Sequence, residues 1–362
     1  MFDCFLINVS LFYLIVRGLF NGTFYPNHGR AFPPEHSTTG KYQHVQTGRN
    51  HRLPEDGELT AHWFFQDPGH RTPLSAEDRA VFLLQNFEQL AKGSKGIISA
   101  SGGNAGMATA YVARKMGVPA TIVIPSSSPQ LVFQKLRDQG ANVKITGKVW
   151  DDANAEALRL AETEGLTYVP PFDHPLLWQG HASMIREVAT SLGPTVKPGA
   201  VVVSVGGGGL LCGVIQGLKE VGWADVPIIA METVGANCFN AAVKAGRLVT
   251  LDDITSAATC LGAKTVCQKA FEYSQSGELT IISELVTDQQ ALHAVQTFLD
   301  EERVLVELAC GASLAAIYSA VVRRLQDEGR LPEDLRSLLV IVCGGSSIDS
   351  EQLSCLRHKL QT

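Results

Sequence analysis

The stretch that decides the fold is Ala200-Val-Val-Val-Ser-Val-Gly-Gly-Gly-Gly-Leu-Leu-Cys-Gly-Val-Ile215. Its apolar first part is typical of a strand that is buried on both faces, and the apolar residues after the glycines are typical of a helix. Between them, Gly206–Gly209 carry no side chains, so the backbone can approach a ligand closely. Because the free N–H groups at the start of a helix attract anions, we predict a phosphate-binding turn here.

The glycine run does not match the two common nucleotide-binding motifs. No Gly-Lys-Ser/Thr follows it, as a P-loop requires, and it does not have the Gly-x-Gly-x-x-Gly spacing of dinucleotide sites. A compact phosphate on a small cofactor therefore fits the run better than a nucleotide does. The alternative is a tight strand–helix turn that binds no ligand.

Three further polar turns follow predicted strands in the same way. Ser101-Gly-Gly-Asn-Ala-Gly106 follows the strand 96–100, and Cys343-Gly-Gly-Ser-Ser347 follows the strand 338–343. Glu232-Thr-Val-Gly-Ala236 follows the strand 228–232. In open α/β sheets the carboxyl ends of parallel strands share one edge, where ligands bind. We therefore predict one polar cleft, lined with backbone hydrogen-bond donors.

Short apolar strands alternate with helices along most of the chain, which predicts an α/β protein with parallel sheets. The other predicted strands are 120–124, 142–146, 168–169 and 201–205. The predicted helices are 80–92, 104–116, 130–139, 149–164, 178–192, 210–221, 236–245, 288–300, 312–327 and 350–361.

Composition limits the class of protein. The 362 residues are 45% hydrophobic, which is enough for two domains with their own cores. A net charge of -6 without a basic block argues against a nucleic-acid partner. Phe5–Phe20 is mostly apolar, but Asn8, Ser10 and Arg17 interrupt it. It is therefore too short and too polar to predict a membrane span. Residues 1–75 show no sustained periodicity, so we predict that they are irregular.

The eight cysteines form no Cys-x-x-Cys pair, which argues against a zinc site. Most lie in apolar segments, as expected for buried thiols in a reducing compartment, so we expect a cytoplasmic protein.

Several of these motifs together resemble one family, the L-serine/L-threonine dehydratases. They are Ser101–Gly106, Pro119–Pro125, Pro171–Pro175, Gly180–Ser183, Val205–Gly213, Ile229–Thr233 and Val340–Gly345. These enzymes depend on pyridoxal phosphate and have its fold type II, like the tryptophan synthase β subunit. The resemblance extends from about Arg79 to residue 362 and is strongest to the animal members. It implies two parallel-sheet domains, an incomplete small one at 76–180 and a large cofactor-binding one at 181–362, after an unmatched segment 1–75.

The resemblance also implies a role for each matching position. Gly206, Gly207, Gly208 and Gly209 would hold the cofactor phosphate, Asn104 its phenolic oxygen, and Cys343 its pyridine nitrogen. Ser101, Gly102 and Gly103 would bind the substrate carboxylate through backbone N–H groups. Glu232, Ala236, Leu261 and Ala263 would form a monovalent-cation site, with potassium expected.

Each position also has a purely structural interpretation. Cys343 alone is typical of a buried core thiol, Glu232 of a group that accepts hydrogen bonds from a helix N-terminus, and Asn104 of a helix N-cap. A structural role also suits His181. Only the ordered set of motifs favours the functional interpretation.

The lysine that the family uses to bind its cofactor covalently is missing from the expected place. Relatives carry a Ser-x-Lys-x-Arg motif, and here the aligned segment reads Ala76-Glu-Asp-Arg79. Upstream of Ser101 the chain has only Lys41, Lys92 and Lys95. An alternative exon or an incorrectly predicted gene would account for this departure.

We therefore expect a homodimer that uses pyridoxal phosphate to eliminate water from L-serine or L-threonine, and whose product then hydrolyses to pyruvate or 2-oxobutyrate and ammonia. The alternative hypotheses are a variant that binds the cofactor without turnover, and a truncated, unstable chain. The sequence does not rank serine against threonine.

Overall fold

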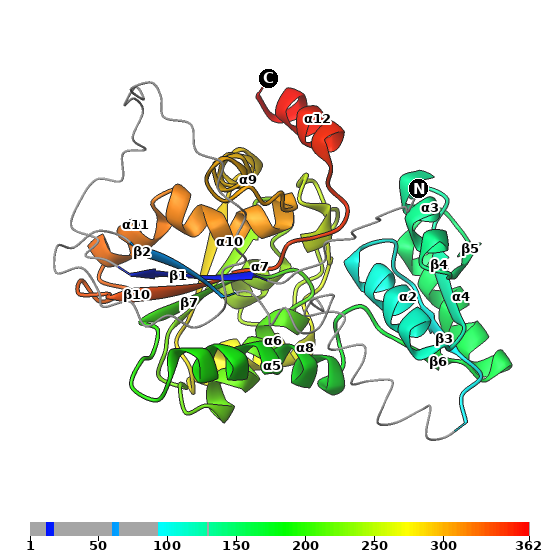
Figure 1. Cartoon of the computed structure of the whole chain (residues 1–362), viewed down its shortest axis with the longest axis horizontal. Coiled ribbons are helices and arrows are strands. Elements are labelled where there is room, and N and C mark those ends of the chain that lie inside the picture. The colour runs from blue at the N-terminus through cyan, green and yellow to red at the C-terminus, as the bar shows by residue number, and fades with distance from the viewer. Residues whose placement is uncertain (1–11, 18–59, 65–92, 129, 362) are drawn as a thin grey trace, which may run out of the picture.

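The computed structural model describes residues 12–17, 60–64, 93–128 and 130–361. These residues form two α/β domains of unequal size, which lie side by side in Figure 1. The expected fold class is thereby confirmed, with both sheets built around parallel strands.

The smaller domain contains a four-stranded parallel sheet of order β5-β4-β3-β6. Its strands are β3 (Ile97–Ser99), β4 (Ala120–Ile124), β5 (Asn142–Ile145) and β6 (Thr167–Tyr168). Helices α2 (Asn104–Met116) and α3 (Gln130–Asp138) pack on one face, and α4 (Trp150–Glu164) packs on the other. Gly117 and Gly165 end two of these helices with φ of 68° and 70°, a conformation that glycine adopts without strain.

The larger domain contains a six-stranded sheet of order β2-β1-β10-β7-β8-β9. Four strands are parallel: β7 (Ala200–Ser204), β8 (Ile228–Thr233), β9 (Ile281–Val286) and β10 (Ser337–Val342). β7, β8 and β10 are buried at every position, as their mainly apolar sequences predict, and their polar residues lie at the strand ends.

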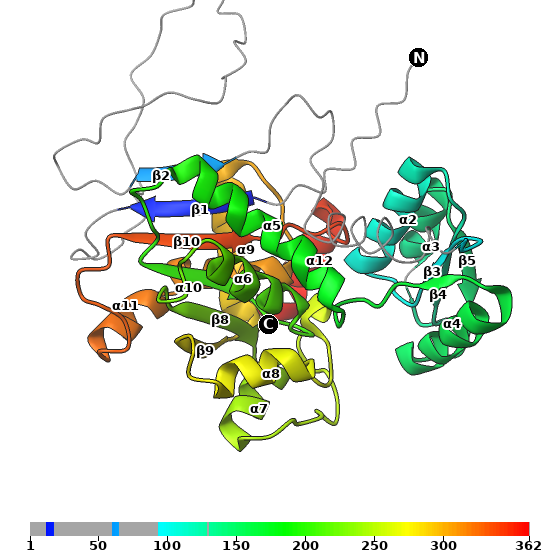
Figure 2. The same ribbon diagram turned by 90° about the horizontal axis from the view of Figure 1, so that it is seen from below.

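Helices cover both faces of the larger sheet (Figures 1 and 2). One layer consists of α5 (Pro175–Leu192), α6 (Gly209–Glu220), α7 (Cys238–Ala245) and α8 (Gln268–Gln275). The other consists of α9 (Asp288–Glu302), α10 (Leu308–Tyr318), α11 (Val321–Asp327) and α12 (Ser350–Gln361). Alternate residues of β7 serve the two layers: Val201 and Val203 pack under α5 and α6, and Val202 packs under α10.

The N-terminal part of the chain contributes two strands that the sequence did not predict. β1 (Phe12–Arg17) pairs antiparallel with β10, from Phe12 opposite Val342 to Arg17 opposite Ser337. β2 (Thr60–Phe64) pairs antiparallel with β1. The prediction that 1–75 is irregular is therefore wrong for these eleven positions, 12–17 and 60–64, because pairing with a distant strand orders a segment that has little periodicity of its own. The remaining positions of 1–75, and the predicted helix 80–92, lie outside the described residues.

The predicted boundary at 180/181 falls inside α5. Leu177, near the start of this helix, packs in the core of the smaller domain, whereas Ile185 and Val188 pack in the core of the larger one. This helix therefore connects the two cores.

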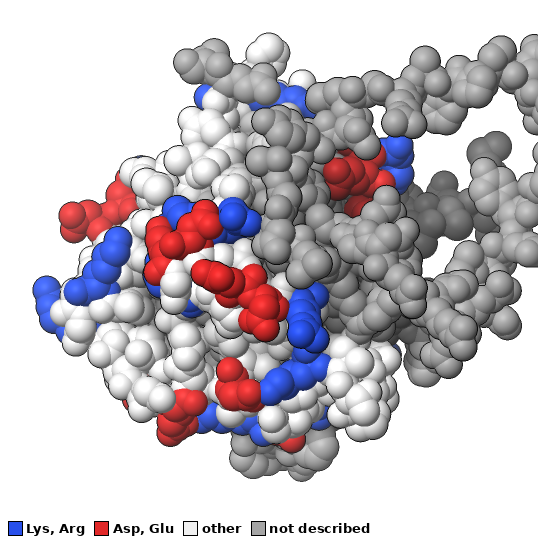
Figure 3. All heavy atoms as spheres, turned by 90° about the vertical axis from the view of Figure 1, so that its left-hand side faces the viewer, with Lys and Arg blue, Asp and Glu red and all other residues white. Residues whose placement is uncertain are grey.

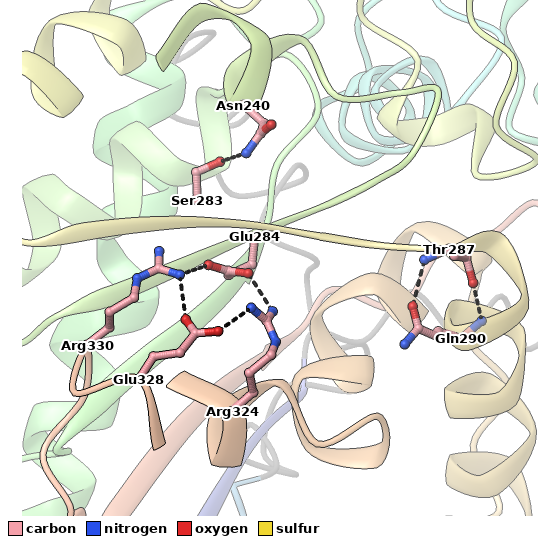
Figure 4. Close-up of polar contacts among 8 residues, drawn as sticks. All are labelled: Asn240, Ser283, Glu284, Thr287, Gln290, Arg324, Glu328 and Arg330. Atoms are coloured by element: carbon pink, nitrogen blue, oxygen red, sulfur yellow. Dashed lines mark hydrogen bonds and ion pairs between the residues drawn. The ribbon is translucent and has the colours of Figure 1, made fainter. Parts of the chain in front are cut away.

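Polar contacts hold β9, a strand that the sequence analysis missed, against the helices beside it (Figure 4). The carboxylate of Glu284, which is 7% exposed, pairs with Arg324 and Arg330 at 2.6 Å each. Just beyond the strand, Thr287 and Gln290 form a reciprocal capping box that begins α9.

Two surface properties bear on possible partners. Among the described residues, no single helix is long and apolar enough to cross a membrane, and only the bent pair α10 and α11 meets the length and composition test. Figure 3 shows basic and acidic side chains interspersed on the side of the larger domain that faces away from the smaller one, so this side carries no uniformly basic surface.

The single helix predicted over 312–327 is wrong, because the structure has two helices there. Ala320, between α10 and α11, adopts the left-handed conformation with φ of 56°. The sequence has no glycine or proline at this point to signal a break. Tertiary contacts provide the reason, since Val321, Val322 and Leu325 pack in the core while Arg324 reaches Glu284.

Replacing Ala320 with glycine should stabilise the protein by about 1 kcal/mol, because a left-handed alanine is strained by about that amount and glycine is not. Ala320 is exposed, so no packing is lost. The measurement is the unfolding midpoint in urea. The matched control is Ala316→Gly inside α10, which should destabilise the protein by about 1 kcal/mol or more. Equal losses from the two substitutions would contradict a left-handed Ala320.

Candidate active site

Two of the predicted turns meet where the domains face each other. Asn104 is the first residue of α2, and its amide oxygen accepts hydrogen bonds from Ser346 N at 2.9 Å and Ser346 Oγ at 2.8 Å. The turn after β3 in the smaller domain therefore contacts the turn after β10 in the larger one. This contact supports the expected cleft at the carboxyl ends of the strands.

Asn104 is not a helix N-cap, because Gly103 occupies that position in α2. Its side chain reaches the other domain, where Nδ2 donates to both carboxylate oxygens of Glu307 at 3.2 Å. The same nitrogen lies 3.8 Å from the sulfur of Cys260. The side chain thus points into the site, where the family resemblance places it, although its contact with a cofactor stays a prediction.

Glu307 is a site residue that sequence analysis missed. Its carboxylate is 5% exposed and also accepts from Ser347 N at 2.7 Å. The available signal was a lone acidic residue directly before Leu308-Ala-Cys-Gly-Ala-Ser-Leu-Ala-Ala-Ile-Tyr318, a helix without any charge. A carboxylate placed there must find polar partners, and here it finds them at the strand ends.

The tetraglycine turn has the form that the sequence predicts. Gly208 has φ of 91° and precedes α6 directly. Among the described residues, no backbone or side-chain atom accepts a hydrogen bond from the N–H groups of Gly206, Gly207 or Gly208. Gly209 and Leu210 lie in the first turn of α6, where N–H groups have no partner within the helix. Several unused donors at a helix N-terminus suit a phosphate group.

Phe172 explains why this turn contains glycine. A Cβ atom on Gly207 would lie 2.4 Å from the Phe172 ring, and one on Gly209 would lie 2.4 Å from the Phe172 carbonyl oxygen. On the other side, Cys267 N donates to Gly207 O at 2.9 Å. The turn is thus held between two elements that leave no room for a side chain.

The predicted substrate turn is also tightly built. Ser101 Oγ accepts from Gly103 N at 3.3 Å, and a Cβ on Gly106 would lie 1.8 Å from Ser101 O. The N–H groups of Asn104, Ala105 and Gly106 open α2 and so lack acceptors within that helix. These donors suit a carboxylate, while the binding roles of Ser101, Gly102 and Gly103 stay predictions. Cys343 directly follows β10 and is half-buried, and its role at a pyridine nitrogen also stays a prediction.

Glu232 accepts hydrogen bonds from Phe239 N at 2.9 Å and Asn240 N at 2.7 Å, at the start of α7. It is fully buried, and burial raises its pKa to about 8, although the two N–H donors act in the opposite direction. Ala236 and Leu261 lie in one hydrophobic cluster, and Ala263 N donates to Leu261 O at 2.8 Å. No group of three His, Cys, Asp or Glu side chains that could hold a metal occurs in the described part of the chain. A potassium site made mainly of carbonyl oxygens is a different kind of site, and it stays a prediction.

Among the lysines near the turns, Lys135 on α3 donates from Nζ to Ser346 O at 2.8 Å. Lys95 is exposed and precedes β3, at the opposite end of the strand from Ser101. Lys41, Lys92 and the segment around Arg79 lie outside the described residues.

Known proteins match this geometry and sequence. The sequence profile described as "Pyridoxal-phosphate dependent enzyme" matches residues 52–344. The chain belongs to this family. Membership implies pyridoxal phosphate as the cofactor, as the sequence predicted. The match begins at residue 52, ahead of the predicted onset near Arg79.

Individual relatives are similar over most of their length. "Serine dehydratase-like" from Homo sapiens is 58% identical over 273 residues, covering 75% of this chain and 82% of the relative. The human "L-serine dehydratase/L-threonine deaminase" is 53% identical over 292 residues, covering 79% and 88%. The predicted resemblance to this group is therefore confirmed.

A solved structure agrees with these relatives. The crystal structure of a fungal L-serine ammonia-lyase from Rhizomucor miehei has a TM-score of 0.72 and 35% identity, over 79% of this chain and 89% of that one. The similarity thus extends across both domains.

A methyl group on Gly207 should weaken cofactor binding, because it would push the turn away from Phe172 and misdirect the N–H groups. We expect Gly207→Ala to raise the Kd for pyridoxal phosphate at least about tenfold, which corresponds to the loss of one or two hydrogen bonds to a charged group. The measurement is equilibrium dialysis, with inorganic phosphate as competitor. Gly103→Ala is the matched control, since a Cβ there meets only Ser101 Oγ at 3.8 Å. An unchanged Kd for Gly207→Ala would contradict the phosphate site.

Proposed function

We propose that this protein is a pyridoxal-phosphate-dependent lyase that converts L-serine, and also L-threonine, to the 2-oxo acid and ammonia. The observation that carries the proposal is the turn Gly206–Gly209, whose N–H donors lack described acceptors at the start of α6. Support comes from relatives that are named for L-serine dehydration and L-threonine deamination and are 50–53% identical.

The described residues at the start of α6 fit the phosphate of the cofactor. The N–H groups of Gly206–Gly209 and the positive end of the α6 dipole bind the phosphate. Cys343, directly after β10, would face the pyridine nitrogen, where a thiol would leave that nitrogen unprotonated. When bound, pyridoxal phosphate withdraws electrons from the α-carbon of the amino acid. An unprotonated nitrogen makes this withdrawal weaker, which suits a β-elimination.

The substrate is held by the first turn of α2. Backbone N–H groups of the turn that begins with Ser101, Gly102 and Gly103 and continues into α2 bind the substrate carboxylate in place of water. A fixed carboxylate would also fix the orientation of the substrate's α-hydrogen and β-hydroxyl.

The segment Ala76–Arg79 contains no lysine. A lysine that bonds to the cofactor and removes the α-hydrogen as a base must therefore lie elsewhere in the chain. Lys135 is the first candidate among the described lysines, since its Nζ contacts the turn after β10. If no lysine serves, the chain is the non-catalytic, cofactor-binding variant.

The proposal is tested with the purified chain, pyridoxal phosphate and either amino acid. We expect 2-oxo acid to form, and borohydride reduction followed by peptide mapping to find one labelled lysine. Lys135→Ala should remove the label if Lys135 is that residue, and Lys95→Ala serves as the control. Cofactor binding that inorganic phosphate displaces, without label or product, would exclude the lyase and establish the non-catalytic alternative.

We also propose a potassium ion at Glu232, Ala236, Leu261 and Ala263, bound by the Glu232 carboxylate and carbonyl oxygens. Its support is the burial of Glu232 without a cationic partner among the described residues. A nearby cation would stabilise the ionised carboxylate.

Potassium binding should therefore strengthen as the pH rises. Without the cation Glu232 has a raised pKa of about 8, so below pH 8 the ion must displace a proton. We expect the Kd for potassium to fall about tenfold per pH unit between pH 6 and 8 and then to level off. Thermal unfolding in potassium or tetramethylammonium chloride measures this effect. It should vanish in Glu232→Gln and persist in Glu284→Gln, a second buried carboxylate away from the site. A pH-independent effect would count against Glu232 as a ligand.

We further propose a homodimer in the cytoplasm, on the basis of the family and the cysteine usage. Size-exclusion chromatography with light scattering tests the dimer, and cell fractionation tests the compartment.

A further inference from the structure

Glu307 occupies an unusual position for an acidic residue. Its carboxylate is buried where the two domains meet, and its described partners are neutral: Ser347 N and the amide of Asn104. No Lys, Arg or His in the described part of the chain forms an ion pair with it. A buried charge held only by N–H donors depends on every one of them.

The surrounding backbone is shaped to admit this carboxylate. A Cβ on Gly345 would lie 2.2 Å from Glu307 Cδ, and Gly345 has φ of 112°, so only glycine fits there. Glu307 N in turn donates to Gly344 O at 2.9 Å. The turn after β10 therefore contacts both the backbone and the side chain of Glu307.

These contacts leave the Asn104 amide only one orientation. The Ser346 N–H group can only donate, so the amide oxygen must face it, at 2.9 Å. An ionised Glu307 carboxylate has acceptors but no donor, so the amide nitrogen must face it. The same amide links the smaller domain to the larger one, and Lys135 adds a second link through Ser346 O.

We infer that Glu307 is a positioning residue that fixes the Asn104 amide and holds the turn after β3 against the turn after β10, before any ligand binds. The inference deepens the proposed function, since it assigns to Glu307 the preorganisation of the residue expected at the cofactor's phenolic oxygen. The contacts themselves lie within the chain, so the inference can be tested without cofactor or turnover.

Two single substitutions should weaken the contact for opposite reasons. Glu307→Gln keeps Oε1, which accepts from Ser347 N and from Asn104 Nδ2, but it replaces Oε2 with an NH₂ group that faces the NH₂ group of Asn104. Asn104→Asp turns a carboxylate toward the carboxylate of Glu307. In the double variant the introduced carboxylate at 104 accepts from Ser346 and from the introduced amide at 307. The double variant therefore restores the hydrogen bonds with donor and acceptor exchanged.

The test is amide hydrogen exchange by mass spectrometry on the cofactor-free protein. We expect each single variant to speed exchange at least about tenfold in the peptides that cover 101–107 and 344–347. In the unchanged protein, local opening of either turn must break the hydrogen bonds between Asn104 and Glu307, and in the variants that cost is reduced. The double variant should return to within about threefold of the unchanged protein. Exchange in β7 and β8 should stay the same throughout.

Glu284→Gln is the matched control, because it alters another buried glutamate of the larger domain whose partners are Arg324 and Arg330. It should leave 101–107 and 344–347 unchanged. Unchanged exchange in the single variants, equal acceleration across β7, β8 and β10, or failure of the double variant to recover would each overturn the inference. A failed lyase assay would not affect these results, so the two proposals can fail separately.

Discussion

Burial of the parallel strands on both faces is the constraint on which the rest of this structure depends. β7, β8 and β10 are covered by helices above and below, and their side chains serve two hydrophobic layers in alternation. Polar groups placed along such strands would lose their hydration, so the sheet accommodates few of them. The chemistry is thereby confined to the carboxyl ends, where the chain turns and backbone donors are free.

Glycine residues allow the backbone at those strand ends to pack closely against neighbouring groups. At Gly207 and Gly209 the backbone runs against Phe172, and at Gly345 it makes room for the carboxylate of Glu307. In each case the missing side chain allows a close approach that a Cβ would block. The N–H groups at the starts of α2 and α6 have no acceptor within their helices, so they are available to a ligand. In the proposed function, one local arrangement, a strand followed by glycine and a helix, binds both the phosphate and the substrate carboxylate.

The two domains depend on each other at this edge. The Asn104 amide and Lys135 reach from the smaller domain to the turn after β10, and Glu307 completes the contact from the larger one. Glu307 is 5% exposed, so a partner lost while the site stays closed would leave the carboxylate short of donors. These hydrogen bonds favour one arrangement of the two turns at the place where the domains meet.

Sequence alone determined the strand–turn–helix units, the family and the glycine positions, because these depend on local periodicity and on backbone freedom. The helix 104–116 and the strand 120–124 agree residue for residue with the structure for that reason. Only the tertiary structure decided the pairing of β1 with β10, the break at Ala320 and the partners of Glu307. Each of these depends on residues that are distant along the chain, and no local pattern encodes which distant group a strand edge, a helix end or a carboxylate will meet.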